Sequence, residues 1–189
     1  MTMTRATQGG SGSTTISPVQ IGVADVLSAC TVSAGIVRCY AEAASVMLDR
    51  YHEHSPVFGT VSLDGEERCA AFTWPPSTDD EKASHANELD AIQYGAYAVS
   101  FIAANRMTGY VVRKRAHHGS GADWLMTKPG ERDDEFVRLE VSGVGRDKSL
   151  EGRLKDKVAQ LGRGDLARPG LAVVVGFEGA AIVMRAVGR

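Results

Sequence analysis

The stretch from residue 119 to residue 160 decides the fold of this chain. It opens with Gly119-Ser-Gly-Ala-Asp-Trp-Leu-Met126, continues through Arg138-Leu-Glu-Val-Ser142 and ends in the apolar stripe of residues 150–162. The first two segments have the two-residue period of strands, and the third repeats its apolar residues at helical spacing. Two strands followed by a helix predict a sheet with a helix packed against it.

Each of these two predicted strands carries one acidic residue. Successive side chains of a strand point to opposite faces, so Leu139 and Val141 face the core and Glu140 shares the other face with Ser142. Glu140 is therefore directed to where Asp123 can meet it. Neighbouring carboxylates offer the hard oxygen ligands that Mg²⁺ prefers. We accordingly expect a Mg²⁺ (or Mn²⁺) site at Asp123 and Glu140.

A lysine accompanies the apolar stripe of the predicted helix. Successive steps of about 100° per residue bring the apolar residues of the helix into one sector. These residues are Leu150, Leu154, Val158 and Leu161. Lys157 falls in or beside this sector, and Gln160 lies on its flank. One interpretation is that Lys157 extends its ammonium group to solvent. The other is that it turns over the sheet edge toward Glu140.

The N-terminal part of the chain predicts a tail, helices and a hairpin. Residues 1–17 are rich in Thr, Gly and Ser, which predicts a flexible tail. Apolar residues recur at helical spacing from 19 to 53, with a break at 33–35, and predict two helices. Strands at 57–63 and 68–74, joined through Asp64 and Gly65, predict a β-hairpin. Residues 77–81 are expected to form a loop.

The remainder predicts an alternation of helices and strands. We expect a long helix at 85–106, strands at 110–116, 122–126 and 136–141, a helix at 150–162, and strands at 171–177 and 181–187. The unbroken apolar run from Leu171 to Val175 is typical of a strand covered on both faces. The fold class is therefore α/β, with a three-layer-like mixed sheet flanked by helices. Residues 18–189 form a single domain, in which 18–84 are a helix and hairpin extension and 85–189 the core.

Composition limits the classes of function. The chain has 189 residues, of which 43% are hydrophobic, and a formal net charge of −2. It therefore lacks the overall positive charge of an obligate, sequence-independent nucleic-acid binder. Its three cysteines form no CxxC pair, which is typical of a reducing cytoplasm. No apolar run has the roughly 18 residues of a membrane helix, and we expect no membrane association and no export signal.

The order of these motifs resembles the PD-(D/E)XK nuclease superfamily over roughly residues 85–178. That family has a helix, a strand with Asp, a strand with Glu-x-Lys, and a helix that can supply Lys or Gln. The resemblance implies a restriction-endonuclease-like core, with Asp123 and Glu140 as ligands of the metal. Ser142 stands where the family has its strand lysine, so Lys157 becomes the lysine that orients water. Gln93 stands near the position of a further acid.

The resemblance implies two alternative functions. The first is a Mg²⁺-dependent nuclease that hydrolyses phosphodiester bonds of DNA or RNA, in bacterial defence or DNA processing. Gln93, Ser142 and Gln160 would then be supporting hydrogen-bonding groups. The second is a catalytically inactive accessory or assembly protein that binds a protein partner through its N-terminal region.

Simpler structural explanations exist for several of these residues. Asp123, which follows a glycine-rich segment, could begin its strand through a turn hydrogen bond. Glu140 could be a surface acid with its own polar partners. His117 and His118 beside the glycine-rich loop could supply a base or a metal ligand, but a histidine pair in an exposed loop is more often inert. The sequence leaves these alternatives open.

Overall fold

The computed structural model describes residues 17–131, 135–146, 149–164 and 168–188. Nearly all of the predicted tail, residues 1–16, lies outside these residues. The elements in chain order are β1 (Val19–Gly22), the 3-10 helix η1 (Val23–Ala29), α1 (Ala34–Tyr51), β2 (Val57–Leu63), β3 (Glu66–Thr73), α2 (Asp79–Ser84), α3 (Glu88–Thr108), β4 (Val111–Arg115), β5 (Trp124–Thr127), β6 (Val137–Val144), α4 (Leu150–Arg163), β7 (Gly170–Gly176) and β8 (Ala181–Val187).

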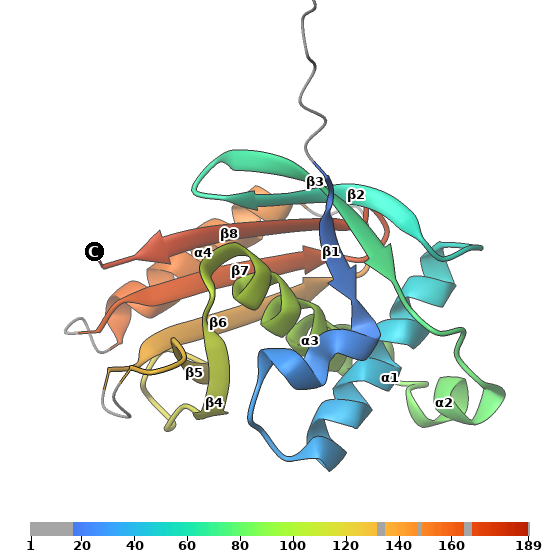
Figure 1. Ribbon diagram of the computed structural model, residues 1–189, viewed down its shortest axis with the longest axis horizontal. Helices are drawn as coiled ribbons and strands as arrows, with labels where there is room; N and C mark the ends of the chain where they lie inside the picture. Colours follow the sequence, from blue (N-terminus) through green and yellow to red (C-terminus); the bar gives the residue numbers. More distant parts are fainter. Residues whose placement is uncertain (1–16, 132–134, 147–148, 165–167, 189) are drawn as a thin grey trace, which may run out of the picture.

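The strands form one mixed sheet with helices on both faces. The eight strands lie in the order β1-β3-β2-β8-β7-β6-β5-β4. Neighbours are antiparallel except for β1 with β3, β2 with β8, and β6 with β7, which are parallel. Helix α4 lies behind the sheet in Figure 1, and α1 and α3 lie in front of it. The predicted α/β class and mixed sheet flanked by helices are confirmed.

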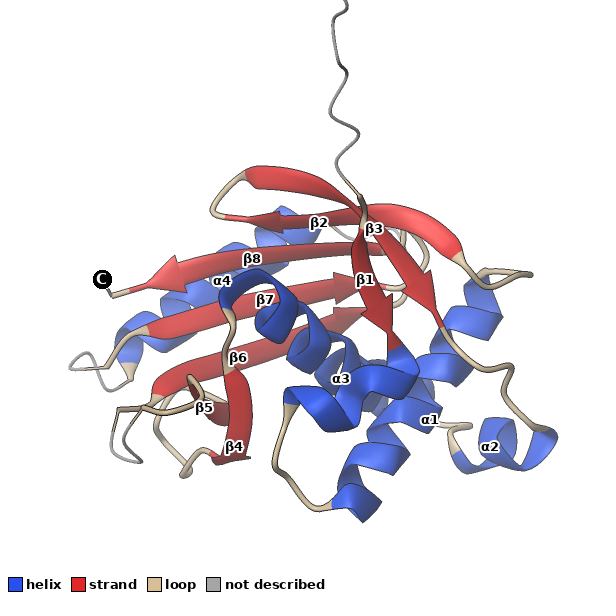
Figure 2. Ribbon diagram, viewed as in Figure 1, coloured by secondary structure: helices blue, strands red, loops and turns tan. Residues whose placement is uncertain are grey.

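The central strand β7 is covered on both faces, as its sequence predicts. Leu171, Val173 and Val175 join the large core beneath α1 and α3. Ala172 and Val174 face the other way and join a smaller core beneath α4. Two alternating sets of apolar side chains therefore hold the three layers together. Figure 2 shows the helices on either side of β6 and β7.

Helix α4 forms where the sequence predicts it. The Ser149 hydroxyl accepts a hydrogen bond from the Gly152 amide, 3.1 Å away, and caps the first turn. Leu154 and Leu161 are buried beneath the helix against the smaller core. The predicted apolar sector is thus confirmed, and it fixes which way the remaining side chains of the helix point.

The N-terminal region shares this sheet. The predicted hairpin is confirmed, and its β2 strand pairs with β8, the last strand of the chain. Asp64 and Gly65 both adopt positive φ, as a tight hairpin turn requires. The prediction of helix at residues 19–22 is wrong, because this segment is the strand β1. Four residues are too few for a period of two to stand out beside the adjacent helical pattern.

Two further boundaries differ from the predictions. Residues 79–84 form the short helix α2 instead of continuing a loop, because Thr78 and Glu81 make a reciprocal capping box. The long helix α3 begins at Glu88, after the Asn87 cap, and ends at Gly109 in a left-handed conformation. None of the helices in the described ranges is long and apolar enough to cross a membrane.

Candidate functional site

Asp123 immediately precedes β5, and Glu140 lies within the neighbouring antiparallel strand β6. Trp124 of β5 pairs with Leu139 of β6, and Asp123 and Glu140 are the residues next to this pair on their two segments. The Asp123 amide donates to the Leu139 carbonyl at 2.9 Å. Strand β6 continues beyond this point while β5 does not, and the Val141 amide donates to Asp123 Oδ2 at 3.0 Å. The Asp123 carboxylate therefore occupies the place of the missing strand backbone.

Glu140 is buried, and only one of its oxygens has a partner. Its side chain is 2% exposed, and Oε1 accepts a hydrogen bond from Lys157 Nζ at 2.6 Å. Oε2 has no hydrogen-bond partner among the residues that the structure describes. The interpretation of Glu140 as a surface acid is therefore wrong. A buried carboxylate oxygen without a donor is costly, and it marks a place where a cation or water would be stabilised.

Burial raises the pKa of Glu140 to about 7, from an ordinary value of 4.5. Desolvation is the largest cause, and the negative charge of Asp123 raises the pKa further. The hydrogen bond from Lys157 acts in the opposite direction but does not cancel these effects. The two carboxylates are therefore close enough to repel each other, and a positive ion between them would relieve this repulsion.

Lys157 comes from α4 and turns toward the sheet. Its ammonium group contacts Glu140 and also donates to Gln160 Oε1 at 3.2 Å. Lys157 and Gln160 are three residues apart in α4, which places them on the same side of the helix. The side chain of Lys157 is 20% exposed, so its tip is largely withdrawn from solvent. Of the two interpretations of Lys157, the structure matches the one in which it points to Glu140.

Tyr97 of α3 holds the other carboxylate. Its hydroxyl donates to Asp123 Oδ1 at 3.1 Å, so that each oxygen of Asp123 has a donor. The Arg115 guanidinium lies 4.6 Å from the centre of the Trp124 ring and 5.3 Å from that of Tyr97. Sequence reasoning missed Tyr97 and Arg115. Tyr97 lies four residues after Gln93 and therefore on the same helix face, which is the signal that could have found it.

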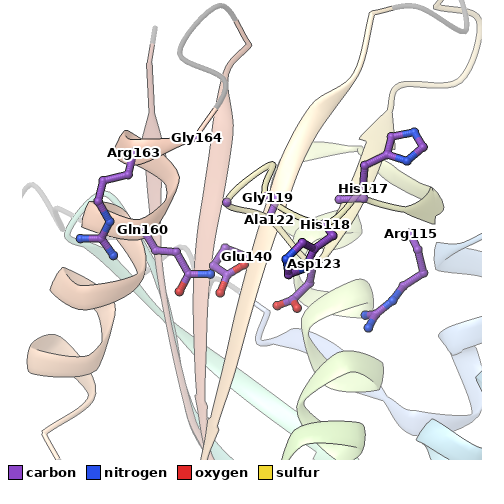
Figure 3. Close-up of a pocket in the computed structure, with 12 residues that line it drawn as sticks. Arg115, His117, His118, Gly119, Ala122, Asp123, Glu140, Gln160, Arg163 and Gly164 are labelled. Atoms are coloured by element: carbon purple, nitrogen blue, oxygen red, sulfur yellow. The ribbon is translucent and has the colours of Figure 1, made fainter.

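A cavity of about 520 Å³ opens above the two carboxylates. It lies between the end of α4 and the segment that joins β4 to β5, and Figure 3 shows Gln160 and the two carboxylates directed toward its centre. The residues that line it are Arg115, Ala116, His117, His118, Gly119, Gly121, Ala122, Asp123, Glu140, Gln160, Arg163 and Gly164. The lining thus combines two arginines with two carboxylates, of which Glu140 is buried.

The expected site residues do not all meet in this cavity. Asp123, Glu140 and Gln160 line it, and Lys157 contacts Glu140 and Gln160 without lining it. Gln93 is half-buried and borders the Tyr97 hydroxyl. Burial raises the pKa of Tyr97, and the hydrogen bond with Gln93 offsets part of this rise. Ser142 is buried on the same face of β6 as Glu140, two residues further along, but it does not line the cavity.

The donor set fits a magnesium ion of low protein coordination. No cluster of three or more His, Cys, Asp or Glu with metal-binding geometry occurs within the described ranges. Mg²⁺ characteristically uses one or two carboxylates and keeps several water ligands. Asp123 and Glu140 supply the carboxylates, the unpartnered Oε2 supplies a free lone pair, and the cavity has room for the waters.

We expect Tyr97→Phe to destabilise the protein by about 1.5 kcal/mol, the lower end for hydrogen bonds to charged groups. The hydroxyl is lost from Asp123, but water from the cavity can partly replace it. Tyr94→Phe is the matched control, because this ring is 38% exposed on the same helix. Urea unfolding measures both changes. Equal stability of the two variants would contradict a specific role of the Tyr97 hydroxyl.

Comparison of the chain with models of known protein families, with curated proteins and with solved structures found no significant match.

Proposed function

We propose that this protein is a Mg²⁺-dependent nuclease that hydrolyses phosphodiester bonds, built on a core similar to that of restriction endonucleases. The observation that carries the proposal is the arrangement around Glu140. This buried acid lies near enough to Asp123 to be affected by its charge, receives Lys157 at 2.6 Å and keeps one oxygen without a partner. The succession of α3, an acid before β5, an acid within β6, and a lysine in α4 supports the family resemblance.

The residues divide the chemistry of hydrolysis among them. A bound Mg²⁺ would stabilise the negative charge that builds up on the phosphate oxygens. Asp123 and Glu140 hold that ion, and Tyr97 and the Val141 amide fix the Asp123 carboxylate. Lys157 orients the attacking water, and Gln160 positions its ammonium group.

The reaction consumes one water molecule and no other co-reactant. The water oxygen forms a bond to phosphorus while the phosphorus–oxygen ester bond breaks. One proton leaves the water, and one proton from solvent reaches the departing oxygen. Arg115 and Arg163, at the rim of the cavity, attract the phosphate.

A second candidate is a non-catalytic accessory protein. Ser142 stands at the position of the strand lysine, and Gln93 adds no charge beside the acids. Leu27 and Ile36 in the N-terminal region are 46% and 47% exposed, and a protein partner there would cover them. For the proposed nuclease, the setting is the cytoplasm, in bacterial defence or DNA processing, with DNA or RNA as the substrate.

The test is cleavage of plasmid, single-stranded DNA and RNA with Mg²⁺ or Mn²⁺. We expect Asp123→Asn and Glu140→Gln to lose activity by about 10²-fold or more, since each removes charge that stabilises the transition state. Asp156→Asn, an exposed acid next to Lys157 in α4, is the matched control and retains activity.

Thermal unfolding with and without Mg²⁺ is the second measurement. An ion present at a hundred times its Kd stabilises the native state by about 2.7 kcal/mol. We expect Mg²⁺ to stabilise the parent protein by this amount and to stabilise neither of the two acid variants. Stabilisation by Mg²⁺ without cleavage would favour the accessory protein. If Mg²⁺ neither stabilises the protein nor supports cleavage, the proposed metal site is contradicted.

A further inference from the structure

One end of the cavity is closed by direct contact between two backbone segments. A methyl group at Gly164, just after α4, would overlap the carbonyl oxygen of Ser120. A methyl group at Gly121 would lie 2.8 Å from the carbonyl oxygen of Gln160. The absence of side chains at these two glycines lets the segments touch. We call this contact the end wall, made of residues 120, 121, 160, 161 and 164.

Arg138 fastens the end wall from below. It is 2% exposed, and its guanidinium donates to the carbonyl oxygens of Leu161 at 2.9 Å and Ser120 at 3.4 Å. It also donates to the carbonyl oxygen of Arg168 at 2.9 Å. One buried side chain thus joins both halves of the wall to β6. The wall is therefore part of the folded core, not a chance contact between surface loops.

The end wall lies close to the two acids. Arg138 precedes Glu140 by two residues on β6, a separation of about 7 Å along a strand. A nucleic-acid strand in a duplex advances about 3.4 Å per phosphate. Only a short end segment of a strand therefore fits between a phosphate at the acids and the wall.

The depth of the acids excludes a duplex from the floor of the cavity. Glu140 is 2% exposed, so a phosphate must enter the cavity to approach it. The volume of about 520 Å³ is that of a small-molecule pocket. A duplex, whose major groove alone is about 12 Å wide, cannot descend into such a space. A single strand can, because its backbone and one base enter without a partner strand.

We propose that the cavity receives the free end of a single-stranded nucleic acid, whose terminus abuts the end wall. The protein then removes one or two nucleotides at a time from that end. This inference rests on the proposed nuclease function and specifies its substrate. A continuous strand would have to pass through the wall, whereas an end needs only one opening. Arg115 and Arg163 at the rim supply positive charge for the incoming phosphates.

The test compares linear and circular single strands of the same sequence, each as DNA and as RNA, with a blunt duplex. We expect the linear strand to be cut at least about tenfold faster than the circle and the duplex. The earliest products should be mononucleotides or dinucleotides. Equal cleavage rates for the circular and linear strands, or long oligonucleotides as the earliest products, would overturn the inference and leave the proposed nuclease function intact.

A wall variant sharpens the comparison. Gly164→Ala forces residues 120 and 164 apart, so we expect the rate on the circle to rise toward that on the linear strand. Gly162→Ala is the matched control, because a methyl group there meets nothing within 4 Å. Circular dichroism verifies that both variants fold. An unchanged preference for linear strands in folded Gly164→Ala would contradict the role of the wall.

Binding separates the inference from catalysis. Fluorescence anisotropy with end-labelled oligonucleotides in Ca²⁺, and again in a chelator, needs no cleavage. The linear strand is expected to bind at least about tenfold more tightly than the circle. If nothing is cleaved but this preference persists, the proposed activity fails and the end-binding cavity stands. If neither form binds, the inference fails.

Discussion

Glu140→Gln is expected to become more stable relative to the parent as pH rises from 4.5 to above 7. The difference across this interval should be on the order of 3 kcal/mol, from a pKa shift of 4.5 to about 7. The folded parent binds a proton at Glu140 more tightly than the unfolded chain does. Its stability therefore falls as pH rises through this window, and the amide removes that fall. Urea unfolding in a chelating buffer at several pH values measures it.

The sign of this effect distinguishes a strained site from an ordinary ion pair. A carboxylate stabilised by its lysine would have a lowered pKa, and replacing it by an amide would destabilise the protein above pH 5. Here desolvation and Asp123 outweigh Lys157, so the opposite is expected. Glu151→Gln, an exposed acid in the first turn of α4, is the control and should show no such trend. A parent and Glu140→Gln variant with parallel pH profiles would contradict the interpretation.

Lys157→Met is expected to cost increasing stability above pH 7. Without the ammonium group, the Glu140 carboxyl of the folded variant keeps its proton because it is buried. In the unfolded chain the same carboxyl is exposed and ionised at these pH values. The parent pKa is about 7, so the added cost is on the order of 1 kcal/mol at pH 8 and of 3 kcal/mol at pH 9. At pH 6, where the carboxyl is protonated in both proteins, this electrostatic cost disappears. Chemical unfolding at the three pH values measures it.

Lys155→Met is the matched control, because this lysine lies two residues away on the exposed side of α4. Its stability should follow that of the parent at every pH. Adding Glu140→Gln to Lys157→Met should abolish the pH-dependent cost, since no buried carboxyl remains. A cost of Lys157→Met that is the same at pH 6 and pH 9 would mean that lost packing, and not charge, is responsible.

The local pattern of apolar residues was sufficient to predict most of the helices and strands but not where each begins and ends. The apolar stripe of α4, the hairpin turn at Asp64 and Gly65, and the two-sided burial of β7 follow from neighbouring residues alone. The strand β1 did not, because it becomes a strand only by pairing with β3, and Val19 and Ala70 are far apart in the chain. The start of α3 was missed because the capping box at Thr78 begins a separate short helix, α2, just before Asn87 caps the next.

The fixed periods of strand and helix are enough to assign the face of β6 that carries Glu140 and the side of α4 that carries Lys157. Three contacts follow instead from the packing of distant segments: Lys157 reaches Glu140, Tyr97 holds Asp123 across 26 residues of sequence, and Gly164 touches Ser120. These contacts depend on strand order and on the depth at which helices pack. Such distances are set by the whole core and not by any local repeat.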